Sequence, residues 1–392
     1  MDPIRNPFAP GAGTRPPELA GRDELVERAA IALDRIALGR PARSFILYGL
    51  RGTGKTVLLG EIRRDAEARG LQAMRIEAPE GRSLPAMLAA PLRALLLKLD
   101  RMESAKLGAK KALRALASFA KLKIAYHDIE VTLDAEPEKG VADSGDLEVD
   151  LTELLLAVGE AAKERGTAAI LAIDEIQYVK EAEMAALISA LHAVAQAQLP
   201  VAMVAAGLPQ LLGQMGRAKS YAERLFEYVE VAALGPGEAR NAIVIPIERE
   251  EESIEPAAVE ALVSATQGYP YFLQEWGKHA WDLAFASPIS LQDVENASIT
   301  ALAELDASFF RVRFDRLTPS EKRYMRAMAE LGPGPHRSGD IADMLGKQVT
   351  QLAPTRNSLI RKGMLYSPAH GDTAFTVPMF DQFMKRIMPD LG

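Results

Sequence analysis

The sequence predicts an α/β protein in which a helix-covered parallel sheet is followed by a helical region and a C-terminal module of short helices and a hairpin. Short apolar runs at residues 44–48, 168–173 and 201–206 have the length and composition of buried parallel strands, and residues 71–77 are expected to form a further strand. Helical segments separate these runs, and strands that alternate with helices form a parallel sheet covered on both faces. After about residue 235 the strand pattern ends and helical periodicity continues alone.

The other elements follow from prolines and from apolar periodicity. Five prolines among the first twenty residues predict an extended arm. Residues 122–134 alternate polar and apolar side chains, which predicts a strand or one arm of a hairpin. Apolar residues at helical spacing predict helices at 23–38, 55–69, 85–121, 147–165, 184–194, 256–286 and 291–313. We therefore expect an arm and core over 1–235, a helical domain over 236–316 and a C-terminal domain over 317–392.

Composition narrows the class of protein. A chain of 392 residues is long enough for about two or three domains, and 48% hydrophobic with 25% charged residues is typical of globular protein. The sequence holds no cysteine, which excludes disulfides, thiolate metal sites and cysteine nucleophiles and fits a reducing compartment. Neither a signal-peptide pattern nor an apolar stretch of membrane-spanning length is visible. We expect a cytoplasmic protein that makes no contact with a membrane.

The charge is unevenly distributed. A net charge of −7 argues against a protein that coats nucleic acid over its whole surface, but not against a local basic patch. Residues 93–123 hold nine basic and two acidic side chains, whereas residues 130–153 hold nine acidic side chains and one lysine. Such blocks are usually solvated faces or loops. The basic residues within 93–123 could also contribute to DNA contact, although a solvated helix face explains them better.

Residues 49–56 read GLRGTGKT and match the phosphate-binding pattern G-x-x-x-x-G-K-[ST] at every fixed position. Glycines let backbone N–H groups converge on phosphate oxygens, and the N-terminus of the following helix adds positive potential. Lys55 would reach the β- and γ-phosphates and assist their chemistry, and the Thr56 hydroxyl would ligate Mg²⁺. The expected ATP or ADP contacts are Gly49, Leu50, Arg51, Gly52, Thr53, Gly54, Lys55, Thr56 and Val57.

The apolar run at 168–175, AAILAIDE, supplies two carboxylates at the end of a predicted strand. In P-loop enzymes an aspartate at this place helps to hold Mg²⁺, which makes Asp174 the second expected metal ligand. Glu175 would then orient or deprotonate the water that attacks the γ-phosphate. Taken alone, an Asp-Glu pair after a strand also suits a helix N-cap. Together with the P-loop, the pair predicts an ATPase.

These motifs, with ELAGRDEL at 18–25, make the chain resemble the AAA+ ATPases, and within them the initiator (origin-recognition) clade and the related archaeal-type and STAND ATPases. The resemblance covers essentially the whole chain. It implies a P-loop NTPase parallel-sheet core of AAA+ type, a helical lid domain and a C-terminal winged helix. It also places residues 18–25 beside the adenine. The segment at 6–13, NPFAPGAG, is similar to the start of bacterial ATP-binding proteins with an N-P-F-x-P-G-x-G arm.

The resemblance implies further nucleotide contacts. Arg224, in ERLF just before the apolar residues 228–232, matches the place of an arginine finger that reaches the ATP of a neighbouring subunit, so self-association is expected. An Arg–Glu pair on a helix surface is the alternative. Gly268 and Pro270, in Gly-Tyr-Pro, resemble the G-x-P motif that brings the lid against the nucleotide, although a structural turn also explains them.

Two departures from the family pattern bear on the rate. The strand at 201–206 continues into AAGLP without the polar sensor residue that many AAA+ enzymes carry there, and the lid shows no clear second-sensor arginine. We therefore expect slow hydrolysis, typical of a switch rather than a motor. The five histidines show no metal-ligand spacing, and Trp276, His279 and Trp281 are expected to pack inside the lid.

The C-terminal domain resembles a winged helix, with helices at 320–331, 338–345 and about 350–362, a cap at Gly363 and a hairpin at 365–377. The third helix carries three basic side chains that suit contacts with phosphates and base edges of double-stranded DNA, namely Arg356, Arg361 and Lys362. Winged helices also dock proteins or serve only as structure.

Two functions remain open. The first is an ATP-dependent switch whose nucleotide state controls assembly and DNA engagement. The second is a STAND-like signalling scaffold, in which ATP closes the lid and the winged helix holds an unidentified protein partner. A metabolic kinase is disfavoured because it leaves the winged helix unexplained.

Overall fold

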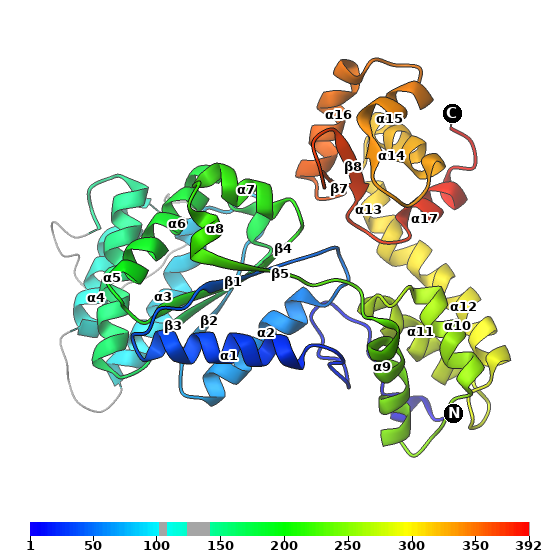
Figure 1. Cartoon of the computed structure of the whole chain (residues 1–392), viewed down its shortest axis with the longest axis horizontal. Coiled ribbons are helices and arrows are strands. Elements are labelled where there is room, and N and C mark those ends of the chain that lie inside the picture. Colours follow the sequence, from blue (N-terminus) through cyan, green and yellow to red (C-terminus); the bar gives the residue numbers. More distant parts are fainter. Residues whose placement is uncertain (102–107, 124–141, 392) are drawn as a thin grey trace.

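A computed structural model describes residues 1–101, 108–123 and 142–391, with only the backbone for 121–123. Five parallel strands form the core sheet in the order β2-β3-β4-β1-β5 (Figure 1). They are β1 (Ser44–Tyr48), β2 (Gln72–Glu77), β3 (Ala169–Asp174), β4 (Val201–Gly207) and β5 (Phe226–Glu230). Since all strands run in one direction, the carboxyl ends of β1 and β3 lie at the same edge of the sheet, where α/β proteins bind ligands.

Helices cover both faces of the sheet because successive strand residues point to opposite sides. In β3, Ile170 packs in the cluster with α1 and α2, and Leu171 packs in the cluster on the other face. The helices are α1 (Asp23–Ala37) and α2 (Lys55–Ala68) on one face, and α3 (Leu84–Arg101), α4 (Gly108–Lys123), α5 (Leu147–Glu164), α6 (Glu181–Gln196) and α7 (Leu211–Ala218) on the other. The fold class predicted from sequence is confirmed.

The predicted core elements agree with the structure to within a few residues, apart from the strand expected at 122–134, whereas α7, α8 (Ala222–Leu225) and β5 were not predicted. Residues 85–121 are expected to be helical, and those that the structure describes are helical, in α3 up to Arg101 and in α4 from Gly108; residues 102–107 lie outside the described residues. The strand expected at 122–134 is wrong at its start, since Leu122 and Lys123 belong to α4, and the rest lies outside the described residues. The edge strand β5 follows the one-turn helix α8.

The lid domain consists of α9 (Pro236–Arg249), α10 (Pro256–Thr266), α11 (Pro270–Leu283) and α12 (Leu291–Leu305). The single helix expected at 256–286 is wrong. Gln267 and Gly268 adopt left-handed backbone conformations, with φ of 52° and 69°, and Pro270 starts the next helix. The helix expected at 291–313 continues from α12 through a π-helical turn (Asp306–Phe310) into α13 (Arg311–Asp315).

The C-terminal domain has the helices and small antiparallel sheet of a winged helix, with strand order β6-β8-β7. Its elements are α14 (Pro319–Leu331), β6 (His336–Arg337), α15 (Ser338–Met344), α16 (Val349–Arg361), β7 (Leu365–Tyr366), β8 (Asp372–Phe375) and α17 (Phe380–Ile387). The final helix α17, not predicted from sequence, packs on α14.

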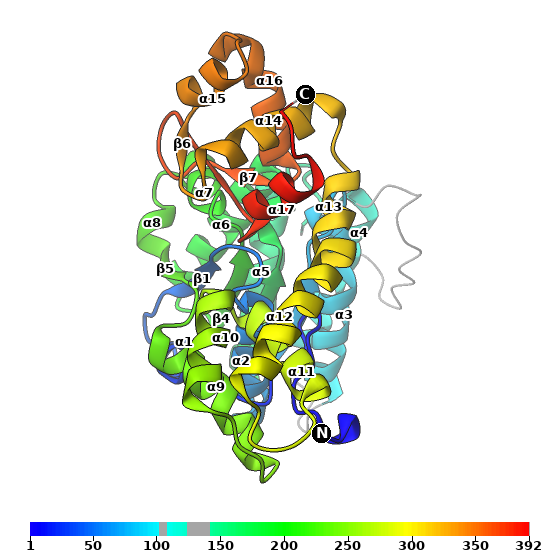
Figure 2. The ribbon, with the colours of Figure 1, turned by 90° about the vertical axis from the view of Figure 1, so that its right-hand side faces the viewer.

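The lid and the C-terminal domain stack along one side of the ATPase core (Figure 2). The two share one hydrophobic cluster, in which Phe310 of the π-helical turn stacks on Phe383 of α17 with ring centroids 5.2 Å apart. The connection through α12 and α13 is therefore packed rather than a loose linker. Among the described residues, the helices are too short or too polar to cross a bilayer.

Candidate nucleotide site

The P-loop joins the end of β1 to the start of α2 and follows a path that side chains would block. A Cβ atom on Gly49 would lie 2.3 Å from the carbonyl oxygen of Val231. Gly54, the N-cap of α2, has φ of 88°, a left-handed conformation that favours glycine. The backbone amides at the start of α2 are thereby left open for an anion.

Lys55 is the buried cation of this loop, with 9% of its surface exposed. Its Nζ donates a 2.6 Å hydrogen bond to the carbonyl oxygen of Leu50. Burial lowers the pKa of Lys55 to about 8, although the negative charge of Glu175 opposes this shift. A buried ammonium group is stabilised by an anion, so the electrostatics of Lys55 favour a phosphate ligand.

Asp174 and Thr56, the two residues that the sequence analysis expects to ligate magnesium, meet at the end of β3. Asp174 is 7% exposed, and burial raises the pKa of its carboxyl group, while a hydrogen bond from Thr56 opposes the increase. A carboxylate and a hydroxyl are oxygen donors of the kind that Mg²⁺ accepts, and Mg²⁺ usually keeps several waters and phosphate oxygens as its other ligands. The donor set therefore fits the ion.

Glu175 follows β3 in a left-handed conformation, with φ of 53°. Its carboxylate accepts a hydrogen bond from Gln177 Nε2 and lies 3.8 Å from Arg51 Nη1. The carboxamide oxygen of Gln177 accepts a 3.1 Å hydrogen bond from the amide of Leu208, just after β4. Gln177 thus links the end of β4 to Glu175. Sequence reasoning noted the apolar end of β4 but missed this glutamine, which comes from a different segment.

A cavity of about 370 Å³ lies beside the P-loop. Residues of the P-loop, Glu175, the arm, the segment 18–22, α11 and the region of α13 all contribute to its wall. Glu18, Leu19, Ala20 and Arg22 belong to the segment that the resemblance places beside the adenine. Val57 and Pro270 also line the cavity. Residues 51–57 and Pro270, among the expected nucleotide contacts, are therefore brought together with the arm around one space, whereas Gly49 and Leu50 do not line it.

Arg313 of α13 lines the same cavity, and the sequence analysis did not find it. Its guanidinium lies over the ring of Phe309, 4.0 Å from the ring centroid. Burial, followed by the nearby positive charge of Arg51, lowers the pKa of Arg313 to about 10. Three arginines and Lys55 line the cavity, against the two carboxylates of Glu18 and Glu175, and this excess of positive charge favours an anionic ligand. No local motif marks Arg313, because its position depends on how α13 packs.

The N-terminal arm runs from the lid to the P-loop. Asn6 Nδ2 donates to Asp282 Oδ1 at 2.7 Å and to the carbonyl oxygen of Lys278 at 3.1 Å. Phe8, 4% exposed, packs against Gly277 of α11. Beyond these anchors, residues 9–14 line the cavity. The sequence predicted the arm to be extended but gave no position for it.

The Gly-Tyr-Pro segment brings the lid onto the P-loop. The carbonyl oxygen of Gly268 accepts a 2.9 Å hydrogen bond from Leu234, which fixes the start of the lid. The amide of Tyr271 donates a 3.1 Å hydrogen bond to the carbonyl oxygen of Gly52. Gly268 shapes this turn without lining the cavity, whereas Pro270 lines it.

The C-terminal domain also contacts the P-loop directly. The backbone amide of Arg51 donates a 2.9 Å hydrogen bond to the carbonyl oxygen of Thr376, which follows β8. The hydroxyl of Thr376 donates a 2.6 Å hydrogen bond to the carbonyl oxygen of Gly363. The wing and the end of α16 are thus joined at the point where they meet the phosphate loop.

The predicted arginine finger lies away from the cavity. Arg224 is exposed on α8 and is not among the residues lining the cavity of its own chain. Of the predicted DNA residues, Arg361 is exposed. Arg356 donates to Thr373 Oγ1 at 2.7 Å, and Lys362 lies 2.7 Å from Glu321. Two of the three basic side chains therefore have partners inside the domain.

Comparison with known proteins supports the fold. Residues 18–204 match the AAA ATPase domain family, and residues 307–384 match a domain of unknown function, DUF8462. No curated protein sequence matches the chain. A Walker-type ATPase of Pyrococcus abyssi superimposes with a TM-score of 0.61 and 15% identity, over 95% of this chain and 97% of that chain.

Two other solved structures align less well. The Orc1 protein of Aeropyrum pernix, in complex with DNA, gives a TM-score of 0.47 and 14% identity over 97% of this chain and 96% of that chain. The RuvB Holliday junction branch migration motor of Thermotoga maritima gives 0.45 and 16% over 93% and 96%. The Pyrococcus similarity shows a shared fold, and the family match includes both phosphate-site motifs. The chain therefore contains an AAA ATPase domain, which includes residues 18–204.

Proposed function

We propose that the protein is a slow ATP-dependent switch, in which the state of the nucleotide site controls the C-terminal domain, self-association and DNA engagement. The observation that carries the proposal is the 2.9 Å hydrogen bond from the Arg51 amide to the Thr376 carbonyl. This hydrogen bond joins the C-terminal domain to the P-loop. The contacts of the P-loop would change when the γ-phosphate is bound or lost. The lid contact between Tyr271 and Gly52 provides a second route from the same loop.

Different residues of the site would bind the phosphates, hold Mg²⁺ and accept a proton during ATP hydrolysis. Lys55, with Arg51 and Arg313 beside it, would neutralise the phosphates. Mg²⁺ held by Thr56 and Asp174 would neutralise further charge that develops on the phosphates. Glu175 would accept a proton from water as that water attacks the γ-phosphorus, giving ADP and phosphate.

Slow turnover is supported by the contacts of Glu175. A general base must lie within hydrogen-bond reach of its water, yet this carboxylate already accepts a hydrogen bond from Gln177 and faces Arg51 at 3.8 Å. Productive geometry would require Glu175 to turn away from Arg51 while it keeps the hydrogen bond from Gln177. A rearrangement of Glu175 before each turnover would slow hydrolysis.

Self-association is supported by the position of Arg224. An exposed arginine on α8 that does not line its own cavity is available to the ATP of a neighbouring subunit. Arg224→Ala should therefore reduce turnover without reducing ATP affinity. The same substitution in a monomeric enzyme would leave both unchanged.

The partner of the C-terminal domain has two candidates. DNA is supported by the exposed Arg361 at the end of α16. A protein partner is supported by a separate observation, namely that Arg356 and Lys362 are held by Thr373 and Glu321 and would have to leave them to meet phosphates. The scaffold function is therefore the second candidate.

The deciding experiment measures ATPase rate and molecular mass with and without duplex DNA, in wild type and in Glu175→Gln. The variant keeps the shape of the side chain and removes the base, so it should bind ATP, accumulate in that state and be the more oligomeric form. Duplex DNA should change the rate or mass of the wild type. Indifference to DNA at low salt would reject the DNA switch in favour of the scaffold, and wild-type turnover by Glu175→Gln would reject the catalytic assignment.

A further inference from the structure

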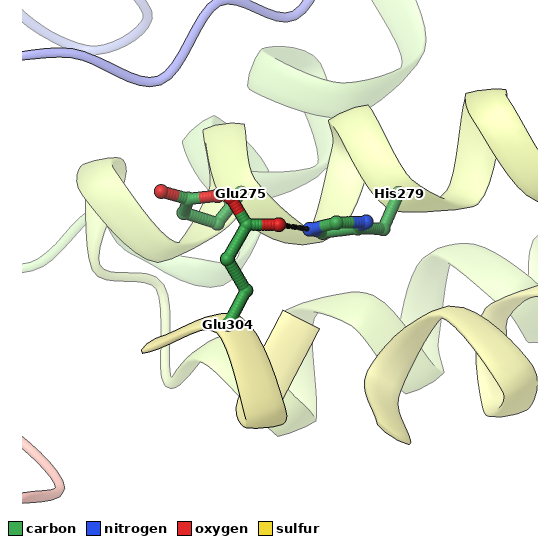
Figure 3. Close-up of side chains that lie close together, drawn as sticks. All are labelled: Glu275, His279 and Glu304. Atoms are coloured by element: carbon green, nitrogen blue, oxygen red, sulfur yellow. Dashed lines mark ion pairs between the residues drawn. The ribbon is translucent and has the colours of Figure 1, made fainter. Parts of the chain in front are cut away.

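A second group of potential metal ligands lies in the lid, on α11 and α12 (Figure 3). Glu275 and His279 are one helical turn apart on α11, and Glu304 reaches them from α12. One ligand atom from each residue lies within 4.8 Å of the other two. His279 Nε2 and Glu304 Oε2 are 3.0 Å apart. The spacing passed unnoticed in the sequence because Glu304 joins only through the packing of the two helices.

The buried ring of His279 is incompletely satisfied. The residue is 7% exposed, and its Nε2 has no partner with hydrogen-bond geometry within the described part of the chain. Its 3.0 Å approach to Glu304 is thus close in distance but misdirected for a hydrogen bond. Two ligand atoms of one tetrahedral ion lie about this far apart, and each directs its lone pair at the ion rather than at the other ligand. A buried polar atom of this kind calls for a partner.

The charges around the ring point to a cation. Glu275 is 7% exposed, and like charges repel strongly when they are removed from water. The carboxylate of Glu304 approaches Glu275 from the facing helix (Figure 3). The Lys278 ammonium lies 3.9 Å from the carboxylate of Glu304, and the Glu304 side chain is half exposed. A divalent ion between the carboxylates would relieve their repulsion and supply the missing partner of His279.

A hydrogen bond from a neighbouring side chain orients one of the three potential ligands, Glu275. Tyr271 OH donates a 2.8 Å hydrogen bond to Glu275 Oε1, which fixes the orientation of that carboxylate. Outer hydrogen bonds of this kind orient metal ligands and raise metal affinity. The amide of the same Tyr271 is bonded to the P-loop at Gly52, so the group lies one residue away from the lid's contact with the nucleotide site.

We propose that Glu275, His279 and Glu304 bind one divalent transition-metal ion, of which zinc is the representative. An imidazole nitrogen with carboxylate oxygens suits zinc, whereas Mg²⁺ and Ca²⁺ prefer oxygen ligands alone. Three protein ligands leave one position for water. The ion joins α11 to α12 and is separate from the magnesium site of the ATPase, so the proposal stands or falls independently of the proposed function.

The test is a calorimetric titration of untagged, chelator-treated, nucleotide-free protein with zinc chloride. Wild type should bind one ion per chain, and Glu304→Gln should weaken binding at least tenfold. This substitution is chosen because Glu304 is half exposed, so the fold should survive it. His279→Gln should abolish binding. The matched controls are His370→Ala, which removes an exposed histidine from the wing, and Asp174→Asn, which alters the magnesium site. Both should bind zinc as wild type does.

Two further measurements separate a built site from loose binding. Cobalt in place of zinc should give the intense visible absorption of a tetrahedral ion, and this should disappear in Glu304→Gln. Tyr271→Phe should lower zinc affinity about tenfold, because it removes the bond that orients Glu275. Absence of stoichiometric binding, or equal binding by wild type and Glu304→Gln, would overturn the proposal and leave a His279–Glu304 ion pair. Loss of zinc in Asp174→Asn would also overturn it.

Discussion

Gly363, at the end of α16, lies so close to the P-loop that a Cβ atom there would approach Arg51 Nη2 to 2.9 Å. The same atom would lie 3.1 Å from Leu208 Cδ1, beyond the end of β4. The C-terminal domain is therefore seated on the two loops that follow β1 and β4. A displacement of Arg51 would therefore change its contact with the C-terminal domain.

Gly363→Ala should weaken the contact between the C-terminal domain and the P-loop. Gly346→Ala is its matched control, since Gly363 and Gly346 have φ of 63° and 60° and a Cβ on Gly346 would meet nothing within 4 Å. Both substitutions should cost roughly 1–2 kcal/mol of backbone strain, but only Gly363→Ala adds the clash with Arg51. Hydrogen exchange at the Arg51 amide should accelerate in Gly363→Ala alone. Equal exchange in the two variants would show that the contact is not a coupling point.

ATP binding should take up protons near pH 8. Burial depresses the pKa of Lys55 to about 8, below its ordinary 10.5, so near pH 8 roughly half of these amines are neutral before binding. Phosphates favour the charged form and raise this pKa, so affinity should fall as pH rises through about 8. Calorimetry in buffers of different ionisation enthalpy should detect about half a proton taken up at pH 8 and almost none at pH 6.5. Equal uptake at both values would contradict the burial of Lys55.

The same shift has a consequence for stability. In the nucleotide-free protein the folded pKa of Lys55 is lower than the unfolded pKa, so the unfolded chain binds more protons between about pH 8 and 10.5. The contribution of Lys55 to the free energy of unfolding should therefore rise with pH across this window. Lys55→Met, compared with wild type in denaturant titrations, should lack this component.

Lys55→Ala should also abolish measurable ATP affinity.

Gln177→Leu should slow hydrolysis while preserving ATP affinity. The side chain joins the Leu208 amide to Glu175, and its loss leaves that amide unpaired and the carboxylate unsupported. A hydrogen bond to a charged group contributes about 1.5–3 kcal/mol, which corresponds to a roughly ten- to hundredfold lower kcat. The control is Gln292→Leu, exposed on α12. An unchanged kcat would mean that Gln177 only packs.

Gly277→Ala should loosen the N-terminal arm. The added methyl would lie 2.7 Å from the Phe8 ring and displace it, while alanine itself favours the helix by about 1 kcal/mol. The cavity wall formed by residues 9–14 would then move, and ATP affinity should fall about tenfold. Gly237→Ala in α9, where a Cβ meets nothing within 4 Å, should have no such effect. Wild-type ATP affinity with a protease-sensitive arm would show that the arm does not contact nucleotide.

Arg313→Gln should weaken ATP more than ADP. The buried guanidinium lines the cavity, and if it contacts the γ-phosphate its contribution to binding would be absent with ADP. Comparative titrations with ATP and ADP check the difference. Equal losses for both nucleotides would place Arg313 near the base or ribose instead.

The sequence alone located the parts of the site that are adjacent in the chain. Two parts are recognisable from local sequence, namely the P-loop pattern at 49–56 and the carboxylates Asp174 and Glu175. Each comes directly after a predicted strand, so its residues lie together at the end of that strand because they are adjacent in the chain. The apolar runs also fixed the class of fold, since buried parallel strands are apolar throughout. Where apolar periodicity continued across a turn signal, the prediction was wrong, as for the helix expected at 256–286, which is divided at Gln267 and Gly268 between α10 and α11.

Only the tertiary structure decided which distant segments meet. Arg313, the arm and Thr376 reach the nucleotide site through packing of the lid and the C-terminal domain. His279 and Glu304 meet because α11 and α12 lie side by side. None of these neighbours is encoded by spacing, since a long-range contact depends on the combined burial of several elements rather than on any one of them. For the same reason, the exposed basic helix predicted from sequence has Arg356 and Lys362 already engaged within its own domain.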